Sequence, residues 1–381
     1  MENKHRRAAD IVMIAVFVII IFGFALALII KSDRDFSEME NRNLAQKPEL
    51  SWSSIKSGDF SDGLESYISD QLFAKDALVT LKTDFDRLLG KSYQNGVYLI
   101  KDSDGRLRYV QKYTEDREQI RENAECLNDL ADKLSIPVDM ILVPNVSAYT
   151  LDKLPAGADC NDQKKSVEYV GSILSDKIGF YPMTETLAAS YEQNYYLTDH
   201  HWTSWGAALA AEDYLRRSGQ LAADGAVNKE PSETVKDFYG TLYSKAPSAF
   251  ADPDVLEIGS SCGVAEIEWV AEGKSGDNLI ERSFLEKKDK YAAFLGGNFA
   301  QVRIRTGREG EKVLILKDSY ANAAVQYLTE QYSEITMIDL RYYCMQERSV
   351  SELCEDYGVD RVIMLYNMDF INEDRNFVWL S

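Results

Sequence analysis

The chain has 381 residues, 45% of them hydrophobic, so it is long enough to bury a sizeable core in one large domain or two ordinary ones. Its formal net charge is −20. Phosphate binding needs clustered Lys and Arg, so this charge argues against nucleic acid as the main partner and against a basic grip on anionic lipid. No cysteine belongs to a C-x-x-C pair, so no zinc or redox motif is indicated. We expect buried thiols or one disulfide among Cys126, Cys160, Cys262, Cys344 and Cys354.

Residues 11–30, IVMIAVFVIIIFGFALALII, predict a membrane-spanning helix. Twenty uncharged residues are enough to cross a bilayer core of about 30 Å as a helix. Basic residues on both sides give a modest bias toward a cytoplasmic N-terminus. A cleaved signal peptide is the alternative, although its apolar core normally has only about 7–15 residues. We therefore predict a cytoplasmic tail over 1–10 and an uncleaved anchor over 11–31, with the main domain outside the cell.

The rest of the chain predicts a helical stalk followed by an α/β domain. Residues 32–94 begin as a polar linker and then carry helical spacing up to a capping Gly90. Residues 95–381 alternate between strand and helix patterns, which favours a mostly parallel sheet covered on both faces. Within them, residues 235–310 mix short strands with turns and predict a β-rich insertion. The expected elements are a hairpin over 95–110, helices over 115–134, 161–177 and 203–219, a strand–turn–helix unit over 311–331, and strands over 137–145, 334–342 and 360–369.

The stretch LILKDSYANAA predicts that a buried strand delivers Ser319 to a turn that opens a helix. In α/β folds the ligand crevice lies at the carboxyl ends of the strands, so a nucleophile is expected at such a turn. Backbone N–H groups at the start of the helix are unpaired and can hold an oxyanion. Taken alone, the stretch favours a plain helix cap formed by Asp318 or Ser319 over a nucleophile.

The chain has three histidines, of which His200 and His201 are adjacent and His5 lies near the N-terminus. A serine nucleophile needs a base, and outside the membrane only His200 and His201 are available. Adjacent side chains are expected to point in different directions, so only one of them acts as the base. Asp199 lies two residues before His201, on the same side of an extended segment, and can orient its ring.

A metal centre and a structural histidine pair are the alternatives for this Asp-His-His run. A catalytic zinc needs about three protein ligands around one point, and the run has no further histidine nearby to complete such a set. We therefore predict no metal.

Thr198-Asp199-His200-His201-Trp202-Thr203 resembles the signature of the DHHW protein family, which is similar to the alginate O-acetylation proteins of the SGNH hydrolase superfamily. Other segments match the style and order of that family. They are Glu40-Asn41-Arg42 with Leu44 and Pro48, YISDQLF (67–73), Asn95-Gly96-Val97-Tyr98, Phe238-Tyr239-Gly240-Thr241-Leu242, Lys317-Asp318-Ser319-Tyr320 and Asp339-Leu340-Arg341-Tyr342-Tyr343.

The resemblance implies an SGNH hydrolase-like three-layer α/β/α domain over 95–381, with Ser319 as nucleophile, His201 as base and Asp199 as the orienting acid. It leaves His200 as a variable residue. Lys317 stands where the common Gly-Asp-Ser block has glycine, and no clear Gly-x-Asn-Asp block supplies a second oxyanion donor. The candidates for oxyanion or substrate binding are Arg341, Tyr366, Asn367 and Trp202.

The function implied by the resemblance is a membrane-anchored extracellular O-acyltransferase. It would acetylate a secreted or cell-wall polysaccharide through an acyl-serine, without a cofactor. Because acetyl-CoA is cytoplasmic, a multipass membrane partner that exports acyl groups is also implied. A carbohydrate acetylesterase with the same residues is one alternative, and a non-catalytic glycan-binding or assembly protein is another.

Overall fold

The computed structural model describes residues 2–40, 42–222, 224–260, 263–343 and 348–380. Asn41, Cys262 and Cys344, which the sequence analysis named, lie outside these residues. The chain divides into two compact units. The first comprises residues 1–90 with 246–249, and the second comprises residues 91–245 with 250–381.

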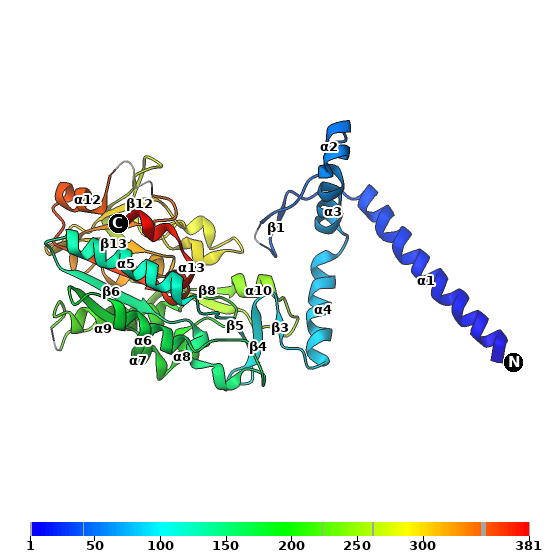
Figure 1. The fold of residues 1–381 in the computed structure, drawn as a ribbon, viewed down its shortest axis with the longest axis horizontal. Coiled ribbons are helices and arrows are strands. Elements are labelled where there is room, and N and C mark those ends of the chain that lie inside the picture. The colour runs from blue at the N-terminus through cyan, green and yellow to red at the C-terminus, as the bar shows by residue number, and fades with distance from the viewer. Residues whose placement is uncertain (1, 41, 223, 261–262, 344–347, 381) are drawn as a thin grey trace. The chain divides into compact units, whose positions relative to one another are not determined.

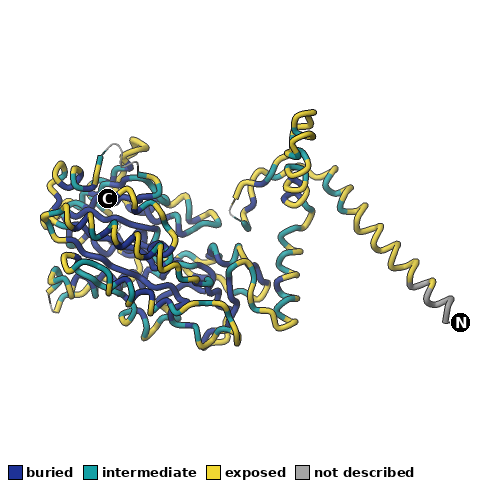
Figure 2. Tube along the Cα trace, viewed as in Figure 1, coloured by how far each residue is buried: buried dark blue, intermediate teal, exposed yellow. Residues whose placement is uncertain are grey.

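The first unit begins with one long apolar helix, α1 (Glu2–Ile30). Its segment Asp10–Ile30 has a mean hydropathy of 3.2 and no buried part, as Figure 2 shows by its largely exposed trace. Length and composition are therefore sufficient for a membrane span. A signal sequence meets the same criterion, so the helix by itself does not distinguish the two.

The predicted stalk is a series of short helices. The side chain of Ser51 caps the first of them by accepting from Ser54 N at 3.1 Å, and Gly58, with φ +93°, ends it. The buried carboxylate of Asp70 accepts from Ala45 N and from the guanidinium of Arg42, which ties the polar linker to these helices. The elements are β1 (Phe36–Ser37), β2 (Arg42–Asn43), α2 (Trp52–Ser57), α3 (Asp59–Gln71) and α4 (Lys75–Leu88).

The second unit is built on an eight-stranded sheet of order β11-β10-β12-β14-β13-β15-β6-β7 among the described residues. The five strands from β14 to β7 run parallel, and β12, β10 and β11 continue the sheet in antiparallel pairing. The bounds are β6 (Val138–Val143), β7 (Ile178–Pro182), β10 (Gly263–Trp269), β11 (Lys274–Asn278), β12 (Gln301–Arg305), β13 (Glu311–Lys317), β14 (Tyr332–Ile338) and β15 (Arg361–Asn367).

Helices cover both faces of this sheet, which gives three α/β/α layers (Figure 1). Successive side chains of β13 point to opposite faces, so Val313 and Ile315 join one core cluster while Leu314 and Leu316 join the other. Because both faces are buried, the strand is an almost continuous apolar run. The first cluster holds α9 (Ser204–Arg217) and α11 (Tyr320–Ala324), and the second holds α5 (Arg117–Lys133), α6 (Gln163–Ile173), α12 (Val350–Tyr357) and α13 (Met368–Glu373). The predicted α/β class with a mostly parallel sheet is confirmed.

The predicted β-rich region over 235–310 supplies strands to the main sheet as well as a separate ribbon. Strands β10, β11 and β12 extend the sheet, while β8 (Pro231–Phe238) and β9 (Asp254–Gly259) form a separate two-stranded ribbon in the described part of the chain. The remaining elements are β3 (Tyr93–Gln94), β4 (Val97–Lys101) and β5 (Leu107–Gln111), which form a third sheet, and the short helices α7 (Thr184–Ala188), α8 (Tyr191–Asn194) and α10 (Thr241–Lys245). Among the described cysteines, Cys126, Cys160 and Cys354 are free thiols.

Candidate active site

Ser319 lies at the turn between β13 and α11, at the carboxyl edge of the sheet where an α/β fold places its crevice. The preceding carboxylate, Asp318, fixes this turn. One of its oxygens accepts from Tyr320 N at 2.9 Å, and the other accepts from the backbone and side-chain amides of Asn367, at 2.7 Å each. The ends of the neighbouring strands β13 and β15 are thereby locked together under Ser319.

The segment that carries the two histidines is a loop held by β9 and α11. The buried carboxylate of Asp254 on β9 accepts from Leu197 N at 2.7 Å, Thr198 N at 2.8 Å and Thr198 Oγ1 at 2.5 Å. At the other end of the loop, Trp202 Nε1 donates to the carbonyl oxygen of Tyr320 at 3.1 Å. The β-rich region and the serine turn therefore both position this loop.

Ser319, His201 and Asp199 form one continuous chain of hydrogen bonds. Ser319 Oγ lies 2.7 Å from His201 Nε2, and His201 Nδ1 lies 2.6 Å from Asp199 Oδ1. Asp199 is 1% exposed. Although burial raises its pKa, the electrostatic interaction with the imidazoles of His200 and His201 and the hydrogen bonds from His201 and Thr241 hold that pKa well below its usual range. An ionised Asp199 only accepts, so His201 carries its proton on Nδ1 and offers a bare Nε2 to the serine hydroxyl.

Gly240 and Thr241 support the second oxygen of Asp199. Thr241 N donates to Asp199 Oδ2 at 2.7 Å and Thr241 Oγ1 donates to the same oxygen at 3.1 Å. Gly240 N donates to Thr198 Oγ1 at 3.0 Å. In the sequence this FYGTL stretch (238–242) is only one of several segments that match the style of the family, and its contact with the aspartate comes from the tertiary fold.

Tyr291 is a site residue that no sequence signal indicated. Its ring stacks on His201 with centroids 3.8 Å apart and planes 9° apart, and its hydroxyl donates to the carbonyl oxygen of Ser319 at 3.3 Å. Tyr291 is buried and lies in a 3-10 turn, Lys290–Ala293, which is far from His201 in the sequence. Only the tertiary fold brings its ring against the imidazole.

The prediction that the adjacent histidines diverge is wrong. Their rings lie 3.8 Å apart, centroid to centroid, with planes 39° apart, because the loop at this point is neither an extended strand nor a helix. Only His201 contacts Ser319, whereas His200 Nδ1 lies 2.7 Å from Thr241 Oγ1.

The ligand atoms of Asp199, His200 and His201 lie within 4.8 Å of one another, which is compact enough for a metal ion. Both ring nitrogens of His201 already bond Asp199 and Ser319. A metal ion bound through His201 would therefore replace one of the bonds that link the serine to the aspartate. We retain the prediction of a metal-free site.

Ser319 opens into a cavity of about 480 Å³. Of the four predicted oxyanion or substrate-binding residues, Arg341 and Asn367 line this cavity. Arg341 is held there by two bonds to the buried Asp339, at 2.8 and 2.6 Å. The other lining residues are Gln111, His200, Thr241, Lys245, Asp318, Asp369, Phe370, Glu373 and Asp374.

Tyr366 and Trp202 do not line the cavity, and their predicted substrate contacts are wrong. Tyr366 is fully buried in the core and stacks on Phe370 with centroids 4.9 Å apart. Trp202 is also fully buried, and its indole N–H is used on the carbonyl of Tyr320. Both side chains therefore stabilise the elements around the site without reaching a ligand.

Lys317, which stands in place of a glycine, is accommodated inside the protein. It is 1% exposed, and Nζ lies 2.9 Å from Asn298 Oδ1, 2.9 Å from Asn322 Oδ1 and 3.2 Å from Asp339 Oδ2. Burial lowers the pKa of this amine, and the charge of Asp339 partly offsets that effect. Because Lys317 is not among the cavity-lining residues, its side chain leaves the approach to Ser319 open.

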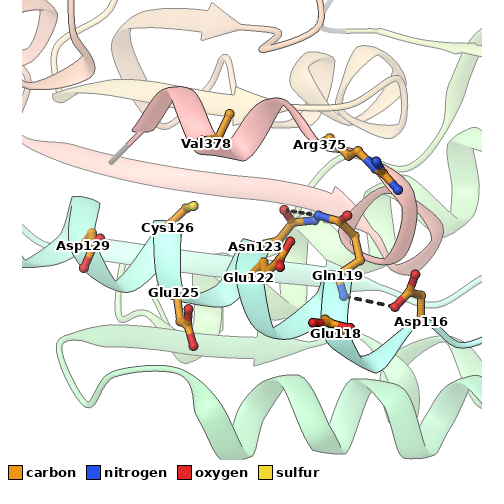
Figure 3. Close-up of a pocket in the computed structure, with 10 residues that line it drawn as sticks. All are labelled: Asp116, Glu118, Gln119, Glu122, Asn123, Glu125, Cys126, Asp129, Arg375 and Val378. Atoms are coloured by element: carbon orange, nitrogen blue, oxygen red, sulfur yellow. Dashed lines mark hydrogen bonds between the residues drawn. The ribbon is translucent and has the colours of Figure 1, made fainter.

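A second cavity, of about 590 Å³, lies along the outer face of α5 and shares no lining residue with the Ser319 cavity. Figure 3 shows carboxylates of α5 along it, with Arg375 and Val378 contributed by the C-terminal segment. None of the described residues that form its wall is a serine or a histidine. The cavity at Ser319 is therefore the candidate active site.

The model of the DHHW protein family matches residues 95–338. A DHHW family protein from Eubacterium siraeum has a similar structure, with 24% identity over 76% of this chain and 95% of its own, and a TM-score of 0.62. Bacillus cereus PatB1 is 20% identical over 74% of this chain and 99% of its own, with a TM-score of 0.59. The structure of PatB1 with a sulfonyl adduct shows 19% identity over 74% of this chain and 98% of its own, with a TM-score of 0.58. The O-acetyltransferase domain of Pseudomonas putida AlgJ is 13% identical over 73% of this chain and 94% of its own, with a TM-score of 0.44.

No curated protein matches the sequence at a significant level. The family model nevertheless covers more than half of the chain, including both the histidine loop and the Ser319 turn. The protein therefore belongs to the DHHW protein family.

Proposed function

We propose that the protein is a membrane-anchored, SGNH-type O-acyltransferase that acetylates a polysaccharide outside the cell. The observation that carries this proposal is the hydrogen-bond chain from Ser319 Oγ through His201 to Asp199, at 2.7 and 2.6 Å. A serine hydroxyl is a weak nucleophile until an adjacent base takes its proton, and this arrangement supplies such a base. The buried carboxylate orients the ring and stabilises the imidazolium that forms.

The reaction has two halves. In the first, Ser319 Oγ attacks the carbonyl carbon of an acyl donor, its proton passes to His201 Nε2, and that proton then leaves with the departing group. In the second, a sugar hydroxyl attacks the acyl-serine and gives its proton to His201. The bond from Ser319 Oγ to the acyl carbon breaks, and Ser319 takes the proton back. The product is an O-acyl sugar and the free enzyme.

The oxyanion that forms in each half needs donors at the cavity wall. The backbone N–H of Ser319, at the start of α11, is one candidate. Asn367 is the second, because its side-chain amide lines the cavity and uses one of its two protons on Asp318. Arg341 is a third, although its bonds to Asp339 limit its reach.

The location and the partner follow from the apolar helix and the chemistry. We propose that α1 stays uncleaved as an anchor with its N-terminus in the cytoplasm. The acyl donor then has to be supplied across the membrane, so the proposal includes a multipass acyl-exporting partner. The acceptor is a secreted or cell-wall polysaccharide.

A carbohydrate acetylesterase is the second candidate function. The same three residues can transfer an acyl group to water as well as to a sugar, and polar residues such as Gln111, Lys245 and Glu373 line the cavity where water would enter as the acceptor. If no ester is turned over, a glycan-binding or assembly protein becomes the better description.

Labelling and ester turnover test the nucleophile. The full-length protein in detergent is incubated with p-nitrophenyl acetate and, separately, with a sulfonyl fluoride, a reagent suggested by the sulfonyl adduct of PatB1. We expect turnover and a label on the peptide that contains residues 317–320, and the loss of both in Ser319→Ala. The exposed Ser172→Ala on α6 is the matched control and should behave as wild type. Turnover at the wild-type rate in Ser319→Ala would show that the mechanism is wrong.

Adding an acceptor separates transfer from hydrolysis. With a neutral oligosaccharide in the same reaction, mass spectrometry should detect ester-linked acetyl groups on the sugar if the protein is a transferase. Turnover with acetate as the sole product would favour the esterase.

A further inference from the structure

His200 is a second imidazole at the site, and the triad does not use it. Its side chain is 27% exposed and lines the cavity that contains Ser319. The ring lies 3.8 Å from that of His201, centroid to centroid. A purely structural ring at this place could carry its proton on either nitrogen. The hydrogen bonds around His200 instead select one of the two tautomers.

The proton is fixed through Thr241. The hydroxyl of Thr241 donates to the ionised carboxylate of Asp199 at 3.1 Å, so its single proton is used there. With the hydroxyl proton of Thr241 assigned to Asp199, the ring nitrogen is the donor in the 2.7 Å contact between His200 Nδ1 and Thr241 Oγ1. His200 thus carries its proton on Nδ1 and has a bare lone pair on Nε2. Burial, together with the neighbouring imidazole His201, lowers the pKa of His200 to about 3, which keeps the ring neutral.

One carboxylate thereby sets two imidazoles in the same tautomer. Asp199 Oδ1 bonds His201 Nδ1 directly, and Asp199 Oδ2 acts on His200 through Thr241. Both Nδ1 atoms face Asp199, at 2.6 and 3.6 Å, so both Nε2 atoms face away from it. His201 Nε2 meets Ser319, whereas His200 Nε2 bonds no described residue and is not a buried atom. It is therefore open to a ligand in the cavity.

We propose that His200 is a specificity-determining residue, whose Nε2 accepts a hydrogen bond from a second hydroxyl of the acceptor, next to the hydroxyl that attacks acyl-Ser319. The site then selects acceptors with two neighbouring hydroxyls, that is, vicinal diols. This inference rests on the proposed function. In the step concerned, the attacking oxygen bonds the acyl carbon and its proton goes to His201 Nε2. The bond to Ser319 Oγ breaks, and that oxygen recovers the proton, while His200 exchanges none.

The test compares two small acceptors that differ by one hydroxyl. Full-length protein in detergent is given p-nitrophenyl acetate with either 1,2-cyclohexanediol or cyclohexanol at equal concentration. The acetylated product and free acetate are quantified, and their ratio reports how acyl-Ser319 partitions between acceptor and water. A neutral hydrogen bond is worth about fivefold in such a ratio. We therefore expect the wild-type ratio for the diol to exceed that for the alcohol by about fivefold beyond the factor of about two that its second hydroxyl gives without any contact.

Two variants of His200 test whether this preference comes from its Nε2. His200→Phe keeps a ring beside His201 but has no lone pair. The preference for the diol should therefore fall to the purely statistical advantage that a molecule with two hydroxyls has over a molecule with one. His200→Gln places an amide oxygen near the position of Nε2 and should restore part of it. Both variants are expected to hydrolyse the ester more slowly than wild type, because the ring contact with His201 changes. Ser172→Ala again serves as the control for the wild-type ratio.

Each outcome decides the inference. A wild-type ratio for the diol no higher than about twice that for the alcohol, which the number of hydroxyls alone would give, overturns it while leaving the proposed function intact, because the ester is still turned over. An unchanged preference in His200→Phe also overturns it. A purely structural role would slow hydrolysis and transfer together and leave the ratio unchanged. Absence of ester turnover in the wild type overturns the proposed function, and this inference with it.

Discussion

Replacing Gly240 by alanine should disable the site through a clash with Asp199. A Cβ atom at position 240 would lie 2.2 Å from Asp199 Cβ, 2.3 Å from Oδ2 and 2.6 Å from Cα. These atoms belong to the backbone and to a short, buried side chain, so no flexible end can swing away. Ordinary contact begins at 3.4 Å, so Asp199 and residue 240 have to separate by about 1 Å.

The expected losses follow from that displacement. A misplacement of about 1 Å in a catalytic group costs on the order of 10²-fold in rate, and loss of the orienting carboxylate costs about 10⁴-fold. We therefore expect ester turnover by Gly240→Ala to fall by a factor between these limits. Overpacking costs about 1–3 kcal/mol in stability, and about 2–4 °C of Tm accompanies each kcal/mol in domains of 150–250 residues. The Tm should drop by several degrees and folding should persist.

The measurement is p-nitrophenyl acetate turnover together with a thermal melt. Gly263→Ala is the matched control, because a Cβ there meets nothing within 4 Å and the backbone does not need glycine. In an Asp199→Asn background, Gly240→Ala should cost little further activity, since both changes act on the same carboxylate. Wild-type turnover in Gly240→Ala, or full additivity in the double variant, would refute the reasoning.

Burial raises the pKa of Asp369 to about 7, whereas a carboxyl in the unfolded chain has a pKa of about 4. The contribution of this group to the free energy of unfolding is therefore complete below about pH 4 and is lost as the pH rises toward 7. The Tm of wild type minus that of Asp369→Asn should therefore be larger at pH 5 than at pH 8, and a difference independent of pH would contradict this. Asp339→Asn should cost about 3–5 kcal/mol in chemical denaturation, because it leaves the buried Lys317 without its carboxylate. Arg121→Gln, which breaks an exposed pair on α5, should cost far less, and equal losses would count against the burial argument. If residues 11–30 anchor the chain, full-length protein stays in membranes after a high-salt wash and is cut by protease from outside the cell, whereas a soluble form that begins after this segment would indicate a cleaved signal.

Local patterns in the sequence were sufficient for the apolar helix, the α/β class and the three residues of the hydrogen-bond chain. Strand β13 buries both faces, so its apolar run is visible without a structure, and Thr203 caps α9 as its position predicts. The pairing of Ser319 with His201 was also expected from the sequence, because apart from His5 the chain has only the adjacent pair His200 and His201 to offer a serine. These features depend on neighbours along the chain or on the scarcity of one residue type.

The tertiary structure alone decided which side chains surround that hydrogen-bond chain. Tyr291 stacks on His201 across 90 residues of sequence, and Thr241 bonds Asp199 across 42. Tyr366 is a polar aromatic residue at the end of a strand, where a ligand-binding side chain is expected. Its side chain nevertheless faces the core, because successive side chains of β15 point to opposite faces. The rings of His200 and His201 lie together because Thr241 and Asp199 hold a loop whose shape no periodic pattern specifies. Contacts between distant segments are set by packing, which a local pattern does not encode.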